Sequence, residues 1–151
     1  MLRGLRESGV KFVVVGGLAG AAHGSRRVTD VLEICYKSRD VNRSKLATVL
    51  ATWNAYPRGV ERGLPFLVDV RQIAITPLMT LATSEGFLDV RDGVKGVGDY
   101  EACRRRSQRV EAFDIRFRVL ELPALIDSMR ASGRPRDIDH IPELEALLAL
   151  R

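Results

Sequence analysis

The sequence contains no apolar run that approaches the roughly 20 residues of a membrane-spanning helix, so we expect no membrane span. Its first nine residues, MLRGLRESG, are too short and too charged for a secretory signal. The chain has only two cysteines, Cys35 and Cys103, and their spacing matches neither a zinc site nor a disulfide framework. Together these absences predict a cytoplasmic protein in a reducing compartment.

The sequence also lacks internal repeats, low-complexity tracts and linkers, so we expect one domain over residues 1–151, long enough to bury a core. The net charge is +5, which favours a polyanionic partner such as nucleic acid or nucleotide phosphate. The alternative is a solvated, arginine-rich surface, because the basic residues are spread along the chain. They cluster only at Arg104, Arg105 and Arg106.

The hydrophobic pattern predicts an α+β fold in which helices flank a mixed β-sheet. Residues 12–15 are continuously apolar, as in a strand that is buried on both faces. The expected strands are 11–15, 31–36, 66–71, 73–83 (interrupted by Pro77), 86–91, 109–112 and 115–120. The expected helices are 1–9, 18–23, one from Asn42 or Ser44 to Asn54 after a turn at 39–42, 99–106 capped by Asp99, 122–131 and 142–150.

The stretch that organises the chain runs from Val13 to Tyr36 and reads VVVGGLAGAAHGSRRVTDVLEICY. Gly16 and Gly17 follow the first strand directly, where glycine permits positive φ and brings backbone N–H groups close to an anion. The helix behind them begins at its positive dipole end, so the corner suits a phosphate. Many strand–helix turns need glycine for geometry alone, so the glycines by themselves are a weak signal.

This stretch resembles the nucleotidyltransferase superfamily, with the minimal polymerase-β-like fold, and within it the toxin and abortive-infection type. That family has a strand, GG or GS, a short helix, and then R-x-T-x-D-h-D-h on the next strand, where h is apolar. The residues that follow the pattern are Val15, Gly16, Gly17, Ala19, His23, Gly24, Arg27, Thr29, Ile34, Cys35 and Tyr36. The two aspartate positions fall on Val31 and Glu33, so the first acid is missing and the second is one methylene longer.

The resemblance extends over most of the chain. Residues 81–90 resemble the family's strand with the third carboxylate, which places that acid at Asp89. Residues 125–138 resemble a C-terminal helix pair that ends in G-R-P-K-D. Many relatives hold the nucleotide with a lysine on the first of these helices; Met129 stands at that position here, next to Arg130.

The resemblance implies metal-dependent transfer of a nucleotide from a nucleoside triphosphate to an RNA or protein acceptor. It assigns catalysis to Glu33, Asp89 and Asp30, with Mg²⁺ or Mn²⁺ weakly held by Glu33 and Asp89. Asp30 would point away from Glu33 on a regular strand and could contribute only through a bulge. Nucleotide binding is assigned to Gly16, Gly17, Arg27 and Arg130.

Because Val31 cannot bind a metal, an alternative is a catalytically inactive module that keeps the fold and binds nucleotide, nucleic acid or a protein partner. A third reading is an oligomerising domain, which an exposed apolar interface would support. Whether the protein is an enzyme or a pseudoenzyme stays open at the level of sequence. His23, His140, Arg134 and Asp137 are interpreted as structural.

Overall fold

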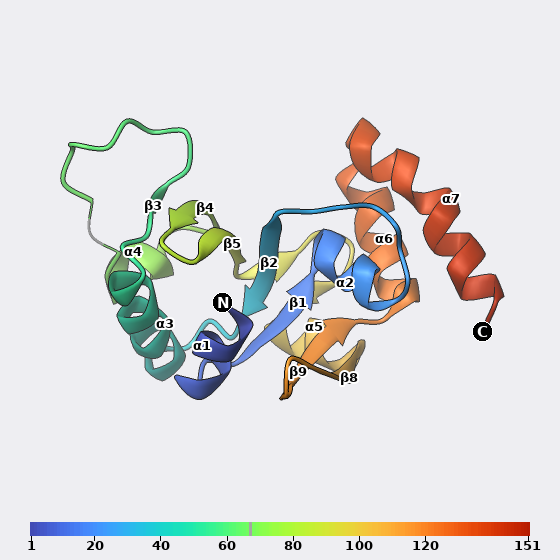
Figure 1. The fold of residues 1–151 in the computed structure, drawn as a ribbon, viewed down its shortest axis with the longest axis horizontal. Coiled ribbons are helices and arrows are strands. Elements are labelled where there is room, and N and C mark those ends of the chain that lie inside the picture. Colours follow the sequence, from blue (N-terminus) through green and yellow to red (C-terminus); the bar gives the residue numbers. More distant parts are fainter. Residues whose placement is uncertain (67) are drawn as a thin grey trace.

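A computed structural model describes residues 1–66 and 68–151. Its centre is a seven-stranded mixed sheet in the order β3-β4-β5-β2-β1-β9-β8 (Figure 1), which confirms the predicted α+β fold. The strands are β1 (Phe12–Val15), β2 (Val31–Tyr36), β3 (Tyr56–Pro57), β4 (Leu78–Thr83), β5 (Gly86–Arg91), β8 (Ser107–Ala112) and β9 (Ile115–Leu120). A separate small ribbon joins β6 (Gly93–Val94) to β7 (Gly98–Asp99).

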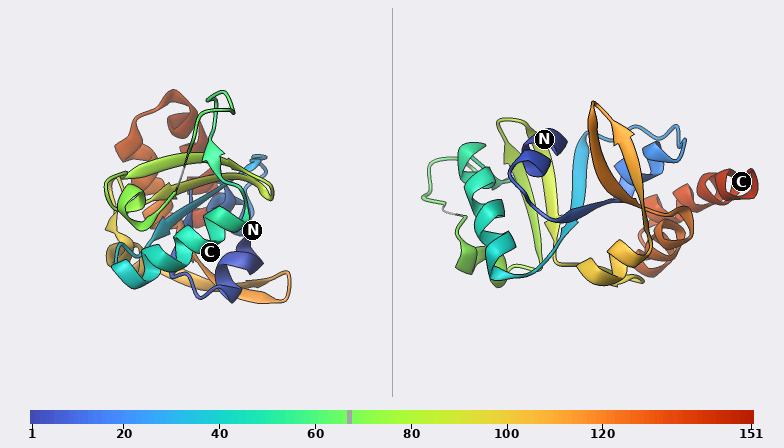
Figure 2. Two further views of the ribbon diagram at one scale, coloured as in Figure 1. Left: turned by 90° about the vertical axis from the view of Figure 1, so that its left-hand side faces the viewer. Right: turned by 90° about the horizontal axis from the view of Figure 1, so that it is seen from below.

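Helices pack on both faces of this sheet and lie at both ends of the molecule. They are α1 (Leu2–Glu7), α2 (Gly16–Ala22), α3 (Asp40–Thr52), α4 (Val70–Ala74), α5 (Tyr100–Arg105), α6 (Leu122–Ser132) and α7 (Pro135–Ala149). The pair α3 and α4 lies at one end of the molecule and the pair α6 and α7 at the other, with the sheet between them (Figures 1 and 2).

The two faces of the sheet have cores of different size. On one face Leu32 and Ile34 of β2 join a large apolar cluster that includes residues of α1, α3 and α4. On the other face Val13, Val15 and Cys35 form a smaller cluster beneath α5. Because side chains alternate along a strand, the face beneath α5 is also the face that carries Glu33. The small core leaves room on that face for polar groups.

The elements around this region match the sequence pattern closely. The strands β1, β2, β5 and β9 begin and end at the predicted residues to within one position. Asp99 caps α5 as expected, with its Oδ1 accepting a hydrogen bond from the Ala102 backbone N–H at 3.0 Å. Gly133 ends α6 in the left-handed conformation at φ 65°.

The strand predicted over residues 66–71 is wrong. Helix α4 begins at Val70, because Asp69 accepts a hydrogen bond from the Gln72 backbone N–H at 2.8 Å and caps the turn. The part of that prediction that falls on Leu67 lies outside the described residues. The next strand starts only after Pro77, since β4 covers Leu78–Thr83.

Two helix starts also differ from the prediction. The turn expected at 39–42 is the first turn of α3, because Asn42 does not cap that helix but binds neighbouring strand ends instead. Helix α7 starts at Pro135, seven residues before Pro142, which lies inside it. Proline is well tolerated at the first helical position, so Pro135 is the true start signal.

Within the described residues, none of the helices combines the length and the apolar character that crossing a bilayer requires.

Asn42 ties α3 to the ends of β1 and β2, and replacing it tests this connection. Its Oδ1 accepts from the Lys11 backbone N–H at 2.7 Å, and its Nδ2 donates to the carbonyls of Lys11 (3.0 Å) and Lys37 (2.9 Å). Asn42→Ala leaves these groups without a partner in a buried position, so we expect a loss of about 1–3 kcal/mol in unfolding free energy. Denaturant unfolding measures the loss. Thr48→Ala, at an exposed position of the same helix, should change stability much less, and an equal loss would contradict this role of Asn42.

Candidate functional site

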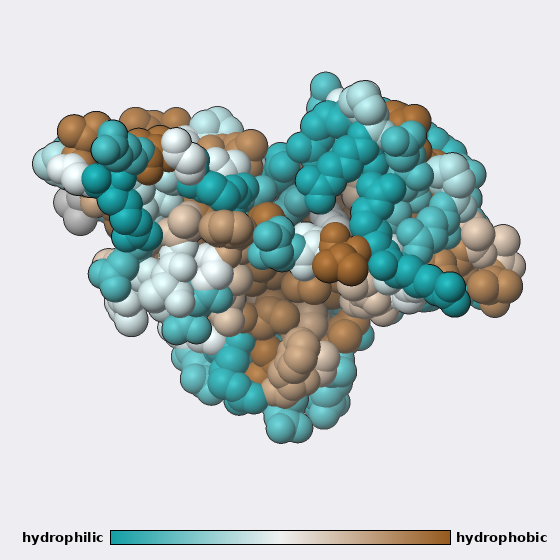
Figure 3. Space-filling view, turned by 45° about the horizontal axis from the view of Figure 1, so that its top comes forward, coloured by the Kyte–Doolittle hydropathy of each residue, from teal (hydrophilic) through white to brown (hydrophobic). Residues whose placement is uncertain are grey.

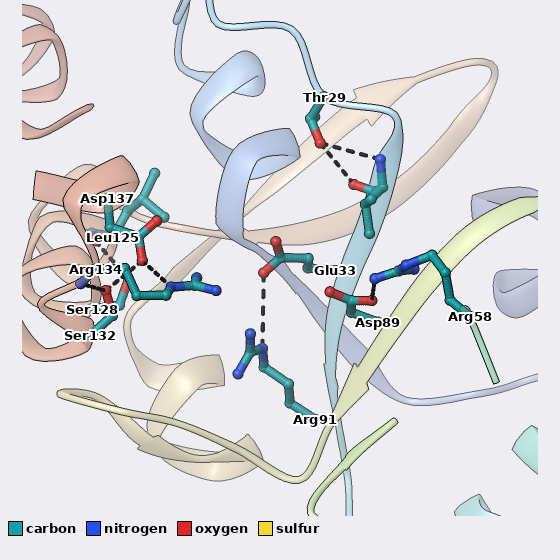
Figure 4. Close-up of polar contacts among 11 residues, drawn as sticks. Thr29, Glu33, Arg58, Asp89, Arg91, Leu125, Ser128, Ser132, Arg134 and Asp137 are labelled. Carbon is teal, nitrogen blue, oxygen red and sulfur yellow. Dashed lines mark hydrogen bonds and ion pairs between the residues drawn. The ribbon is translucent and has the colours of Figure 1, made fainter. Parts of the chain in front are cut away.

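Two carboxylates lie side by side in the middle of the sheet. Glu33 of β2 is the register partner of Asp89 of β5 in a parallel pair, and also the partner of Val15 in the antiparallel pair with β1. Adjacent strands lie about 4.8 Å apart, so both acids rise from one face at neighbouring positions (Figure 4). The structure therefore brings together the two acids that the resemblance selects.

The glycine corner lies directly against one of these acids. Gly16, which follows Val15, has φ +65°, and a Cβ built there would lie 2.4 Å from Oε2 of Glu33. At Gly17 a Cβ would approach Thr29 to 3.2 Å. A side chain at position 16 would thus collide with the Glu33 carboxylate and strain the backbone. The glycine pair thus allows the backbone of the corner to lie close to the Glu33 carboxylate.

Each of the two acids already has a guanidinium partner. Arg58 Nη2 donates to Asp89 Oδ1 at 2.6 Å, and Arg91 Nε lies 3.9 Å from Glu33 Oε2 (Figure 4). Arg58 is held in turn by a hydrogen bond from its Nη1 to the Leu81 carbonyl at 3.1 Å and by the ring of Phe87, 5.3 Å away. Arg58 thus binds Asp89 directly, whereas Arg91 is close enough to Glu33 for an ion pair but not for a hydrogen bond.

Sequence reasoning missed both arginines. Arg91 stands two residues after Asp89 on the same strand and therefore on the same face, so strand alternation could have identified it. Arg58 lies in a segment read as a loop, and it reaches Asp89 only because β3 pairs with β4. No local pattern in the sequence predicts that pairing.

Burial affects the chemistry of Glu33. Loss of solvent raises the pKa of the Glu33 carboxyl above its usual value of 4.5, and the charge of Asp89 acts in the same direction. The positive charge of Arg91 opposes this shift without cancelling it. Glu33 is thus less readily ionised than an exposed glutamate.

The wall opposite the acids comes from the start of α7 and the end of α6. Asp137 is buried and accepts hydrogen bonds from Arg134 Nε at 2.8 Å and from the Ser132 hydroxyl (Figure 4). Arg27, in the segment before β2, donates from Nη1 to the Arg136 carbonyl at 2.7 Å. These contacts join the basic segment to α7 and close one side of the cleft.

The cleft between these walls is open to solvent and has a volume of about 290 Å³. Positive side chains outnumber negative ones among the residues that line it. The cations are Arg27, Arg58, Arg91, Lys95, Arg134 and Arg136, and the acids are Glu33, Asp89 and Asp137. The space-filling view shows a hollow between the two ends of the molecule, with hydrophilic side chains on both of its sides (Figure 3). Such a cleft attracts anions.

The other predicted site residues lie in different places. Gly16, Gly17 and Arg27 line the cleft, as does Val31. Asp30 is exposed and is not among the lining residues. Arg130 points to α7, where it forms an ion pair with Glu145, and it does not line the cleft either.

The residues present fit a resident magnesium ion poorly. Magnesium prefers oxygen ligands with nearly octahedral geometry. In the cleft Val31 offers no oxygen, and Asp89 and Asp137 are each bound by an arginine. The described residues contain no group of three or more His, Cys, Asp or Glu side chains placed to hold a metal.

The geometry of the sheet, the glycine corner and the paired acids defines a class of fold, that of the nucleotidyltransferases. A solved structure with this fold is a proposed nucleotidyltransferase from Thermotoga maritima, which superimposes with a TM-score of 0.55 at 15% sequence identity. The match covers 99% of this chain and 93% of the other protein. At this identity the likeness shows the fold alone. No family model matches the sequence, and no curated protein matches it.

A Gly16→Ala substitution tests the close approach between the corner and Glu33. Alanine would adopt an unfavourable positive φ and would also displace the carboxylate from its place beside Arg91, so we expect a loss of roughly 1–3 kcal/mol in unfolding free energy. Gly59→Ala is the matched control: Gly59 has φ +82° but nothing within 4 Å of a built Cβ, so it isolates the backbone strain. Equal losses in the two variants would show that the Glu33 carboxylate moves aside without cost.

Glu33→Gln tests the burial of the carboxylate through the pH dependence of stability. Because the folded-state pKa is raised, the folded protein binds more protons than the unfolded chain, and ionised Glu33 destabilises the fold at neutral pH. We expect the variant to have a higher Tm at pH 8. This advantage should shrink as the pH falls through the raised pKa towards 4.5. Thermal unfolding at several pH values measures the difference, and Glu85→Gln, at an exposed position, should show none.

Proposed function

We propose that the cleft binds the triphosphate of a nucleoside triphosphate through its arginines and lysine, without a resident metal and without nucleotidyl transfer. The observation that carries the proposal is the occupation of Asp89 and Glu33 by Arg58 and Arg91. Guanidinium groups bind phosphate oxygens in a bidentate geometry and retain their charge at all physiological pH values. They supply the positive charge that a metal would otherwise bring to the phosphates.

In this mode of binding the acids of the cleft oppose the ligand. Ionised Glu33 and Asp89 repel phosphate oxygens, and Asp89 keeps Arg58 turned towards itself. Removing either negative charge should therefore strengthen nucleotide binding. If the same acids acted as metal ligands, their removal would weaken binding in the presence of Mg²⁺. The two functions thus predict changes of opposite sign.

The experiment measures nucleoside triphosphate affinity by calorimetry, in EDTA and in Mg²⁺, for the wild type, Glu33→Gln and Asp89→Asn. We expect similar affinity in the two buffers and several-fold tighter binding by both variants. Lys95→Gln, which removes a lining cation, should weaken binding roughly tenfold, whereas Lys45→Gln on the outer surface of α3 should not. Binding that requires Mg²⁺ and disappears in Asp89→Asn would overturn the proposal.

The second candidate function is metal-dependent transfer of a nucleotide to an RNA or protein acceptor. It is favoured by the register of Glu33 and Asp89 beside Gly16. Incubation with labelled nucleoside triphosphates, Mg²⁺ or Mn²⁺ and acceptors would reveal it as label transfer that Glu33→Ala and Asp89→Ala abolish. The double variant Val31→Asp with Glu33→Asp tests whether the scaffold supports transfer once the acids are restored.

The narrower assignment to the toxin and abortive-infection type is a proposal that rests on the residues between Val15 and Tyr36.

A further inference from the structure

A second basic cleft lies at the opposite end of β1 from the glycine corner. It has a volume of about 400 Å³ and is bounded by the end of α1, the start of β1, α5 and the β8–β9 hairpin. Figure 2 shows the hairpin, in orange, extending from the sheet near α1 and α5. This cleft shares no lining residue with the cleft around Glu33. Phe12 lines this cleft and Val15 lines the other, and three residue steps along β1 separate them by about 10 Å.

Every charged side chain that lines this cleft is positive. Its charged residues are Arg6, Lys11, Arg104, Arg109, Arg116 and Arg118, and no acid stands among the lining residues. Arg116 pairs with Glu111 at 3.4 Å, and Arg6 Nε donates to the Arg116 carbonyl at 2.8 Å. Within the described part of the chain, five of these cations form no ion pair: Arg6, Lys11, Arg104, Arg109 and Arg118. Only Arg116 has an acidic partner, so five positive charges are left without compensation.

Strand register places some of these charges against one another. Arg109 of β8 is the direct cross-strand partner of Arg118 of β9. Like charges in directly opposite positions destabilise a sheet. Arg118 alternates with the buried Phe117 and Val119, so it emerges on the face that α5 covers, where Arg104 also lies. The fold therefore tolerates an electrostatic cost here that an anionic ligand would relieve.

The shape and composition of the cleft specify the ligand. The rings of Tyr100 and Phe117 line the cleft but are only 7% and 9% exposed, so they offer little area for base stacking. Recognition must then fall on phosphates, without sequence preference. A rigid duplex is too wide to enter a hollow of this size, whereas a flexible strand can. We propose that this second cleft binds the phosphodiester backbone of a single-stranded nucleic acid.

The test measures binding of a fluorescent 12-nucleotide oligouridylate by anisotropy over a salt series. Five uncompensated cations predict a slope of log affinity against log salt of about −3.5. The double variant Arg104→Gln with Arg109→Gln should reduce the magnitude of this slope by about 1.4 and weaken binding at low salt by roughly tenfold or more. Arg118→Gln, as a second variant, should reduce it by about 0.7.

The matched control is Arg105→Gln with Arg71→Gln, which removes the same charge from exposed positions outside the cleft. Arg105 is the immediate neighbour of Arg104 on α5. Comparing the two double variants therefore separates the effect of a cation's position in the cleft from the effect of the protein's net charge. Equal losses in the two double variants, tighter binding of a matched duplex, or competition by inorganic tripolyphosphate at equal phosphate concentration would each overturn the proposal. Nucleoside triphosphate binding at the Glu33 cleft should persist in the Arg104 and Arg109 variant, so the two proposals fail independently.

Discussion

The parallel pairing of β2 with β5 is the constraint on which the rest of the site depends. It sets Glu33 beside Asp89 in a partly buried position, where two ionised carboxylates repel each other and lose solvation. The register cannot slip, because Leu32, Ile34, Leu88 and Val90 fill the large core on the opposite face. A shift of β2 by one residue would turn Leu32 and Ile34 away from this core and Glu33 into it. The core therefore fixes the acids in a place where they are costly.

The surrounding structure offsets this cost with charge from elsewhere in the chain. Arg58 follows β3 at the edge of the sheet, Arg91 ends β5, and the charge of Arg134, just before α7, also acts on Glu33. Val31 lines the same cleft without contributing a charge, so the cations there outnumber the acids.

The parts of the fold that sequence could predict are those set by local pattern. Local sequence alone determines three of the predicted features: the strand β1 from its apolar run, the strand β9 from its alternation, and the start of α5 from the cap at Asp99. The errors arose where one local signal competed with another. Residues 66–71 alternate like a strand, but the Asp69 cap starts a helix there. Pro142 resembles a helix start, but Pro135 already provides one.

The candidate site was also predictable only in part. Strand alternation predicts that Glu33 projects next to Gly16, and the resemblance to the family adds Asp89. Neither predicts that Arg58 lies 2.6 Å from that acid, because this contact depends on the pairing of β3, β4 and β5. A carboxylate acts as a metal ligand or as the partner of a cation according to what faces it, and the facing groups come from distant segments. The chemistry of this cleft therefore follows from the topology of the sheet rather than from the motif that marks its position.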